Sequence, residues 1–210
     1  MAPGKKVALS TKKIGVSERG PFSYTKLSYL CSMKETISCD YKLLEGIINF
    51  FFGDNGWYGK VEPNRINVLI NGMDVSVESD AFPADIISLN SMVTIEIGGG
   101  GIGRKLDPRD KIKQRSPGIA NALSTLFIST IVKDNYYHQT IYQHGKAILV
   151  KEYPEKCNTE KVVFSYTLDT KSDFTYDPDI CREIVKDIAK KHPETEFVLD
   201  LMEWFNTKEK

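Results

Sequence analysis

The feature that most constrains the fold is a series of four β-type segments between residues 125 and 168. Each segment alternates apolar with polar residues or is rich in β-branched and aromatic residues, which is typical of strands. Turn residues at 133–135 and 144–145 separate the first three, which predicts an antiparallel meander. The four segments are Thr125–Val132, Tyr136–Tyr142, Ala147–Val150 and Val162–Leu168.

A β-hairpin is expected further upstream. Two apolar runs, Arg65–Ile70 and Val75–Val77, flank the dipeptide Asn71-Gly72, and both of these residue types tolerate the positive φ of a tight hairpin turn. A last strand is expected over Glu196–Leu201.

Helical spacing occurs on either side of these strands. Apolar residues recur at intervals of three and four from Asp40 to Phe51, and Gly53 ends the pattern. A second amphipathic helix follows Asp177-Pro178, where proline at an early helical position costs no hydrogen bond. The combination predicts an α+β fold, a two-layer sandwich in which a mixed, mostly antiparallel sheet is covered on one face by helices.

The length and composition favour one domain. Residues 21–210 are enough for a single hydrophobic core, whereas residues 1–20 are rich in Lys, Ser and Gly and predict a flexible N-terminal arm. Lys and Arg total 28 and so do Asp and Glu, so nucleic-acid binding would need a local patch. We find no apolar run long enough for a membrane span and no secretory signal, and we expect a cytoplasmic protein.

The four cysteines form no short-spaced group with each other or with histidine. We interpret them as reduced thiols, and a zinc site or a disulfide framework is the alternative. The cysteines are Cys31, Cys39, Cys157 and Cys181.

A glycine-rich and basic segment, residues 98–118, contains almost no large apolar side chains. We predict a long mobile loop there, followed by a short helix over Gly118–Leu123. Loops of this length inside a domain tend to be lids or binding elements, and plain disorder is the alternative.

Residues 116–200 contain a series of short motifs: Asn121-Ala122-Leu123-Ser124, His138-Gln139, Ile141-Tyr142, His144-Gly145 and Phe174. In their order and spacing these motifs resemble the second half of the ATPase domain of gyrase B and topoisomerase IV, in the GHKL family. The resemblance extends from about Asp40 to Leu201 and implies that fold, with ATP bound between the first helix and a lid. The chain stops before the position of the family's transducer domain, which we do not expect here.

Glu45 and Asn49 match the catalytic pair of that family. The resemblance assigns Glu45 the role of activating the attacking water and Asn49 that of holding the magnesium ion of ATP. Their spacing of four places both on one face of a helix. The alternative is that they are simply the polar side of an amphipathic helix.

The adenine site departs from the family pattern. The family reads adenine with an Asp in a D-x-G-x-G motif, and here the run is VESDAFP, in which Ser79 or Asp80 could substitute and both glycines are missing. The supporting Thr of a later strand corresponds to Lys161. We therefore expect weak base recognition, since an unpaired donor costs about 1–3 kcal/mol.

The phosphate site departs further. Gly98 and Gly99 fall where the family has the glycine pair that opens its lid. The family's G-x-x-G-x-G loop, however, corresponds to residues 111–116, KIKQRS, with no glycine. Lys111, Lys113 and Arg115 could attract phosphate by charge, but bulky residues prevent the close approach of backbone N–H groups.

These departures lead to three functional hypotheses. The first is a degenerate, non-hydrolysing GHKL domain that needs no cofactor and binds another protein, such as a topoisomerase-related partner or a second copy. The second is a genuine ATPase domain of a divergent type II topoisomerase subunit, with ATP and Mg²⁺. The third is DNA binding, which a steep salt dependence would reveal. The basic residues available for DNA are Lys5, Lys6, Lys12, Lys13, Arg104, Lys105, Arg109, Lys111, Lys113 and Arg115.

Overall fold

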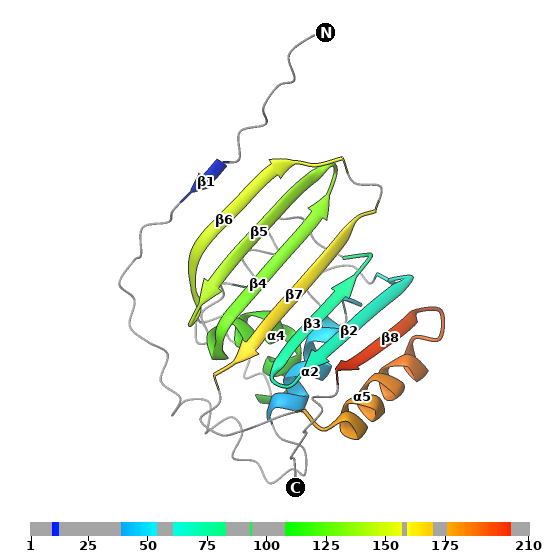
Figure 1. Ribbon diagram of the computed structural model, residues 1–210. Helices are drawn as coiled ribbons and strands as arrows, with labels where there is room; N and C mark the ends of the chain where they lie inside the picture. Colours follow the sequence, from blue (N-terminus) through cyan, green and yellow to red (C-terminus); the bar gives the residue numbers. More distant parts are fainter. Residues whose placement is uncertain are drawn as a thin grey trace, which may run out of the picture.

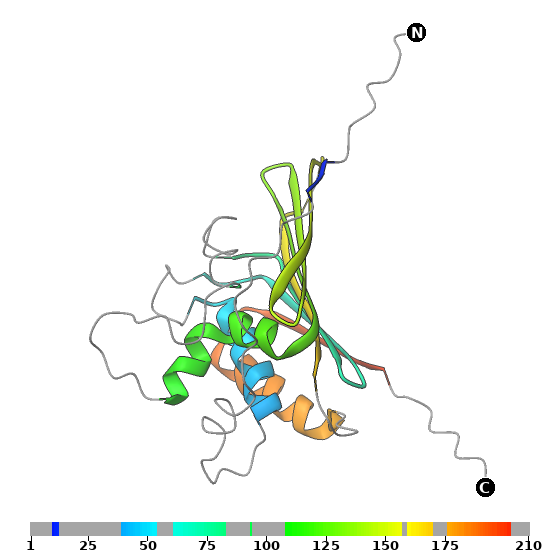
Figure 2. The same cartoon turned by 90° about the vertical axis from the view of Figure 1, so that its left-hand side faces the viewer.

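The computed structural model describes residues 10–12, 39–53, 61–82, 93, 108–156, 159–169 and 176–202. Its helices lie together against one side of a broad twisted sheet (Figures 1 and 2). The helices are α2 (Cys39–Phe50), α4 (Pro108–Leu123) and α5 (Pro178–Lys191). The strands are β1 (Ser10–Lys12), β2 (Arg65–Asn71), β3 (Asp74–Ser79), β4 (Ser124–Lys133), β5 (Tyr136–Gln143), β6 (Lys146–Pro154), β7 (Lys161–Leu168) and β8 (Glu196–Met202).

The sheet has eight strands in the order β1-β6-β5-β4-β7-β3-β2-β8. Strands β4, β5 and β6 form the predicted antiparallel meander. Strand β7 does not extend the meander beyond β6, because it returns to pair with β4 and joins the meander to the β2–β3 hairpin. Only β2 and β8 pair in parallel among the described strands. The predicted class, an α+β sandwich with a mixed, mostly antiparallel sheet, is confirmed.

The hairpin turn lies one residue later than the sequence predicted. Asn71 pairs with Asp74, so the two turn residues are Gly72 and Met73 rather than Asn71 and Gly72. Gly72 has a φ of 61°, and glycine at the first turn position suits the tight turns that match the twist of a hairpin. The register places Val75, Val77 and Ser79 on the side of the sheet that faces the helices.

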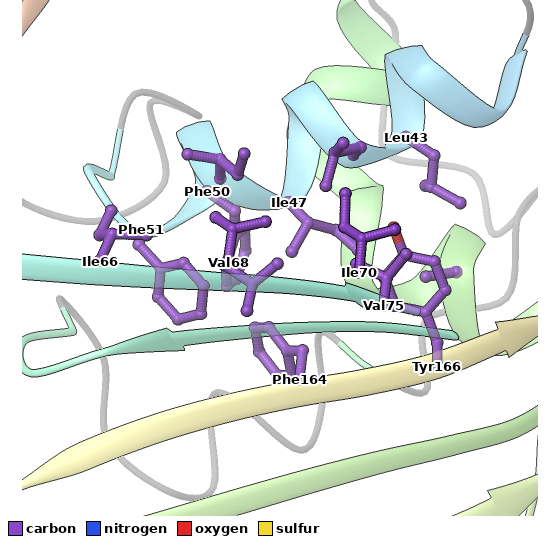
Figure 3. Packing of buried hydrophobic residues seen from close by; sticks show 14 of the residues in the cluster. Leu43, Ile47, Phe50, Phe51, Ile66, Val68, Ile70, Val75, Phe164 and Tyr166 are labelled. Carbon is purple, nitrogen blue, oxygen red and sulfur yellow. The ribbon is translucent and has the colours of Figure 1, made fainter. Parts of the chain in front are cut away.

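Helix α2 forms the centre of the hydrophobic core. Its side chains Leu44, Ile47 and Ile48 have no exposed surface, and the helix contacts both α4 and α5. Figure 3 shows side chains of α2 meeting those of β2, β3 and β7. Burial of this kind contributes about 1.5–3 kcal/mol for each large apolar side chain.

Helix α5 begins as its sequence indicates. The Asp177 carboxylate accepts hydrogen bonds from the backbone N–H groups of Asp179 (2.8 Å) and Ile180 (3.2 Å), and Pro178 occupies the first turn. The Asp177 N–H in turn donates to the Tyr41 hydroxyl of α2 at 2.7 Å. The cap therefore also ties the start of α5 to the central helix.

The prediction of one loop over residues 98–118 is wrong for its second part. The structure describes Pro108–Leu123 as a continuous helix, in place of a short helix beginning at Gly118. Proline is tolerated in the first turn of a helix, and the polar residues that follow Pro108 are compatible with a solvated helix surface. Gly98 and Gly99 lie outside the described residues.

Part of the predicted N-terminal arm is a strand. Residues Ser10–Lys12 pair antiparallel with β6, with Ser10 opposite Glu152. Among the helices that the structure describes, none has the length and apolar character needed to cross a bilayer.

Candidate functional site

The two motifs that the resemblance singled out meet at the end of α2. Glu45 and Asn49 are half-buried on this helix, and Phe50 and Phe51 follow immediately. The ring of Phe50 lies 5.3 Å from that of Phe82, and the ring of Phe51 lies 6.1 Å from it. The end of α2 and the turn after β3, which carries Ser79 and Asp80, are therefore neighbours.

Phenylalanine rings fill the space between these motifs and β7. Phe164 of β7 stacks on Phe51 with ring centroids 5.3 Å apart and lies 5.9 Å from Phe50. It also contacts Phe127 of β4 at 5.8 Å. Figure 3 shows Phe51 and Phe164 between α2 and the strands. Sequence reasoning missed this cluster, although the run Phe50-Phe51-Phe52 was a signal for it.

Ser79 and Asp80 are engaged in local hydrogen bonds. The buried Ser79 hydroxyl donates to the Ala81 carbonyl at 2.7 Å. The Asp80 carboxylate accepts from the Asn64 side chain at 3.1 Å and from the Arg65 backbone N–H at 3.2 Å. Asp80 therefore holds the start of β2 against the end of β3.

Lys161 faces away from the helices, and this corrects its assignment to the position of the family's Thr. Successive side chains of a strand point to opposite faces, and in β7 it is Val162, Phe164 and the alternate residues after them that are buried. The Lys161 ammonium lies 3.0 Å from the Glu78 carboxylate. The helix-facing position next to Lys161 is Val162, which offers no hydrogen-bonding side chain.

A cavity of about 150 Å³ opens beside this turn, at the ends of β3, β4 and β7. It is small compared with sites for drug-sized ligands, which start at about 300 Å³. The residues that line it include Asp80, Phe82, Ile131, Lys133, Glu160 and Lys161.

The segment that corresponds to the phosphate loop is helical. Residues 111–116 lie inside α4, which starts at Pro108. In an α-helix the backbone N–H groups beyond the first turn bond to carbonyls four residues earlier and are no longer available to a ligand. The side chains of Lys111, Lys113 and Arg115 lie outside what the structure describes.

Three further residues that match the family pattern, Asn121, Ser124 and Gly145, make contacts that hold the fold together. Buried Asn121 donates to the Val93 carbonyl at 3.0 Å, and Ser124 donates to the Ala120 carbonyl at 2.6 Å. Gly145 has a φ of 76°, and a Cβ added to it would lie 3.5 Å from the Ala122 backbone. These contacts join the end of α4 to Val93 and to the turn between β5 and β6. Within the described residues no group of three His, Cys, Asp or Glu side chains could hold a metal ion.

One solved structure with this arrangement is the 43K ATPase domain of gyrase B from Thermus thermophilus, crystallised with an aminocoumarin. The TM-score is 0.58, with 14% sequence identity, and the match covers 77% of this chain and 43% of that one. The fold is GHKL-like. No family model matches the sequence, and no curated protein does either. The chain thus has the fold of a gyrase B ATPase domain and spans less than half of that neighbour's length.

Proposed function

We propose that this chain is a degenerate GHKL-like domain that acts without hydrolysing ATP, as a protein-interaction or regulatory module related to type II topoisomerases. The observation that carries the proposal is α4. Where the resembled family has a glycine loop, this chain has a helix that begins at Pro108, whose backbone N–H groups at residues 112–116 are used within the helix.

The surroundings of α2 support the same proposal. A bound adenine ring would need the space between α2, β7 and the Asp80 turn, and three fully buried phenylalanines, Phe50, Phe51 and Phe164, occupy it. Asp80 and Ser79 are already hydrogen-bonded to neighbouring residues. The described residues therefore fit ATP with Mg²⁺ poorly.

The test is a titration with a non-hydrolysable ATP analogue and Mg²⁺, followed by calorimetry and thermal unfolding. We expect no heat of binding and no shift at millimolar nucleotide. A ligand present at 100 times its dissociation constant would stabilise the fold by about 2.7 kcal/mol, so a bound nucleotide would be visible. Such a shift would refute the proposal.

The interaction part of the proposal is tested separately. Purified type II topoisomerase subunits are mixed with the chain, and complex formation and the rate of DNA supercoiling or relaxation are measured. We expect a complex with one subunit or a changed rate, and light scattering shows whether the chain instead pairs with a second copy. If the chain forms no complex with a subunit, leaves the rate unchanged and does not pair with a second copy, the proposed interaction is contradicted.

The alternative is an ATPase domain of a divergent type II topoisomerase subunit. One observation favours it: Glu45 and Asn49 are one helical turn apart on α2 and neither is fully buried. If the chain hydrolyses ATP, Glu45→Gln should abolish turnover and leave the free energy of unfolding almost unchanged. An equal rate in the variant would assign the hydrolysis to a contaminant.

A further inference from the structure

The face of the sheet that the helices leave open carries an apolar groove of about 360 Å³. Figure 2 shows that α2, α4 and α5 lie on the other side. Two cross-strand rows of residues define the groove. The first row is Ile128, Ser165, Ser76 and Leu69, and the second is Leu126, Thr167, Asp74, Asn71 and Met202.

The middle of the groove is low because its residues are small. The hydroxyls of Ser76 and Ser165 lie 2.8 Å apart and share a hydrogen bond. Large apolar side chains form the banks, with Leu126 and Ile128 on β4 and Leu69 on β2. The banks are three strand spacings apart, or about 14 Å, which is wide enough for an extended segment with aromatic side chains.

The apolar banks are exposed to solvent in the part of the chain that the structure describes. Leu126 is 39% exposed and Met202 is 53% exposed. Single exposed apolar residues are common, but a contiguous apolar groove marks a contact site.

The position of Met202 identifies the occupant. It is the last residue of β8 and it lines the groove. The sequence continues as Glu203-Trp204-Phe205, and two residues of extended chain span at most about 7 Å. A turn after Met202 would therefore bring the rings of Trp204 and Phe205 over the floor of the groove.

We propose that residues 203–210 dock on the open face of the sheet, with Trp204 and Phe205 in the groove between β4 and β2. The docked rings would remove Leu126, Leu69 and Met202 from water, and burial of apolar surface of this kind is favourable. The proposal is independent of whether the chain binds nucleotide, because the groove lies on the face opposite α2 and α4.

Tryptophan fluorescence tests the proposal, because the chain has two tryptophans, Trp57 and Trp204. In the Trp57→Phe variant, Trp204 is the sole reporter. We expect blue-shifted emission and protection from acrylamide, compared with a peptide of residues 203–210. Adding Leu126→Asp should raise the quenching constant to that of the peptide. The matched control is Ile148→Asp on β6, which is 43% exposed and does not line the groove, and it should leave the protection intact.

The opposite results would overturn the proposal. Quenching of Trp204 equal to that of the peptide, or insensitivity to Leu126→Asp, means that the segment does not occupy the groove. Protection that disappears on dilution means that a second copy supplies the ring. If Trp57→Phe fails to fold, a chain ending at Met202 replaces it. A fluorescently labelled peptide of residues 203–210 should bind to that chain, and Leu126→Asp should abolish this binding.

Discussion

Single residues near the end of α2 are engaged in contacts inside the protein. The Asp80 carboxylate accepts a hydrogen bond from the Arg65 backbone N–H and holds the start of β2. Val162 is buried on the helix-facing side of β7, and the ring of Phe164 stacks on that of Phe51. Each of these contacts stabilises the fold.

Replacement of Phe164 by alanine tests the importance of this packing. We expect Phe164→Ala to lower the free energy of unfolding by about 3–5 kcal/mol, because the ring is fully buried and a cavity remains. Ile148→Ala, at an exposed position on β6, is the control and should change stability by less than about 0.5 kcal/mol. Urea denaturation measures both. A small effect of Phe164→Ala would mean that the cluster is loosely packed.

Alkaline titration tests the burial of Cys181. Burial, with Asp177 nearby, raises the pKa of its thiol from 9.0 to about 11. The unfolded chain then ionises first, so stability is complete below pH 9 and falls between pH 9 and 11, by about 2 kcal/mol. Burial also raises the pKa of Tyr142 to about 12. Ionisation of this tyrosine should therefore lower the stability further between pH 10 and pH 12.

The variant Cys181→Ala should lack the first of these two losses. Urea denaturation at intervals from pH 8 to pH 11 compares it with the parent chain. Parallel curves for the two proteins would contradict a buried, neutral thiol.

At the scale of elements, sequence patterns predicted most of the described strands and two of the three described helices, because apolar periodicity reports which face is buried. They did not reveal α4 upstream of Gly118, since its first part has no apolar stripe and resembles a loop in composition. They also misplaced Lys161, because a resemblance aligned without structure does not show which face of β7 a residue takes. The pairing of β7 with β4 depends on contacts between distant segments.

Glycine substitutions test whether residues 111–116 are helical. We expect Lys111→Gly with Gln114→Gly to lower stability, each by about 1 kcal/mol relative to alanine, because glycine is a poor helix former. Lys111→Ala with Gln114→Ala is the matched control, since it removes the same side chains and keeps helix propensity. Circular dichroism should show loss of helix for the glycine pair alone. Equal stability of the two double variants would mean that the segment is a loop.

At the scale of the whole molecule, the two edges of the sheet are protected differently. Strand β1 pairs with the middle of β6, whereas β8 forms the other edge and contacts α5. An unpaired edge is a template for association with other chains. The short N-terminal strand therefore shields the longer of the two edges.

Removal of residues 1–20 should expose this edge. We expect the shortened chain to associate as its concentration rises, while the full chain of 210 residues stays in its original state. Light scattering coupled to size-exclusion chromatography measures the mass. A charge placed on the edge by Val150→Lys should suppress the association, and an unchanged mass at all concentrations would show that β1 has no protective role.

The order of the strands also affects how the chain reaches this structure. Strand β2 pairs with β8, and most of the chain lies between residues 71 and 196. The local hairpins of β4, β5 and β6 can form early, but the parallel pair requires closure of a very long loop, which slows folding. During synthesis on the ribosome, the meander would therefore be assembled while the edge next to β2 is still unoccupied.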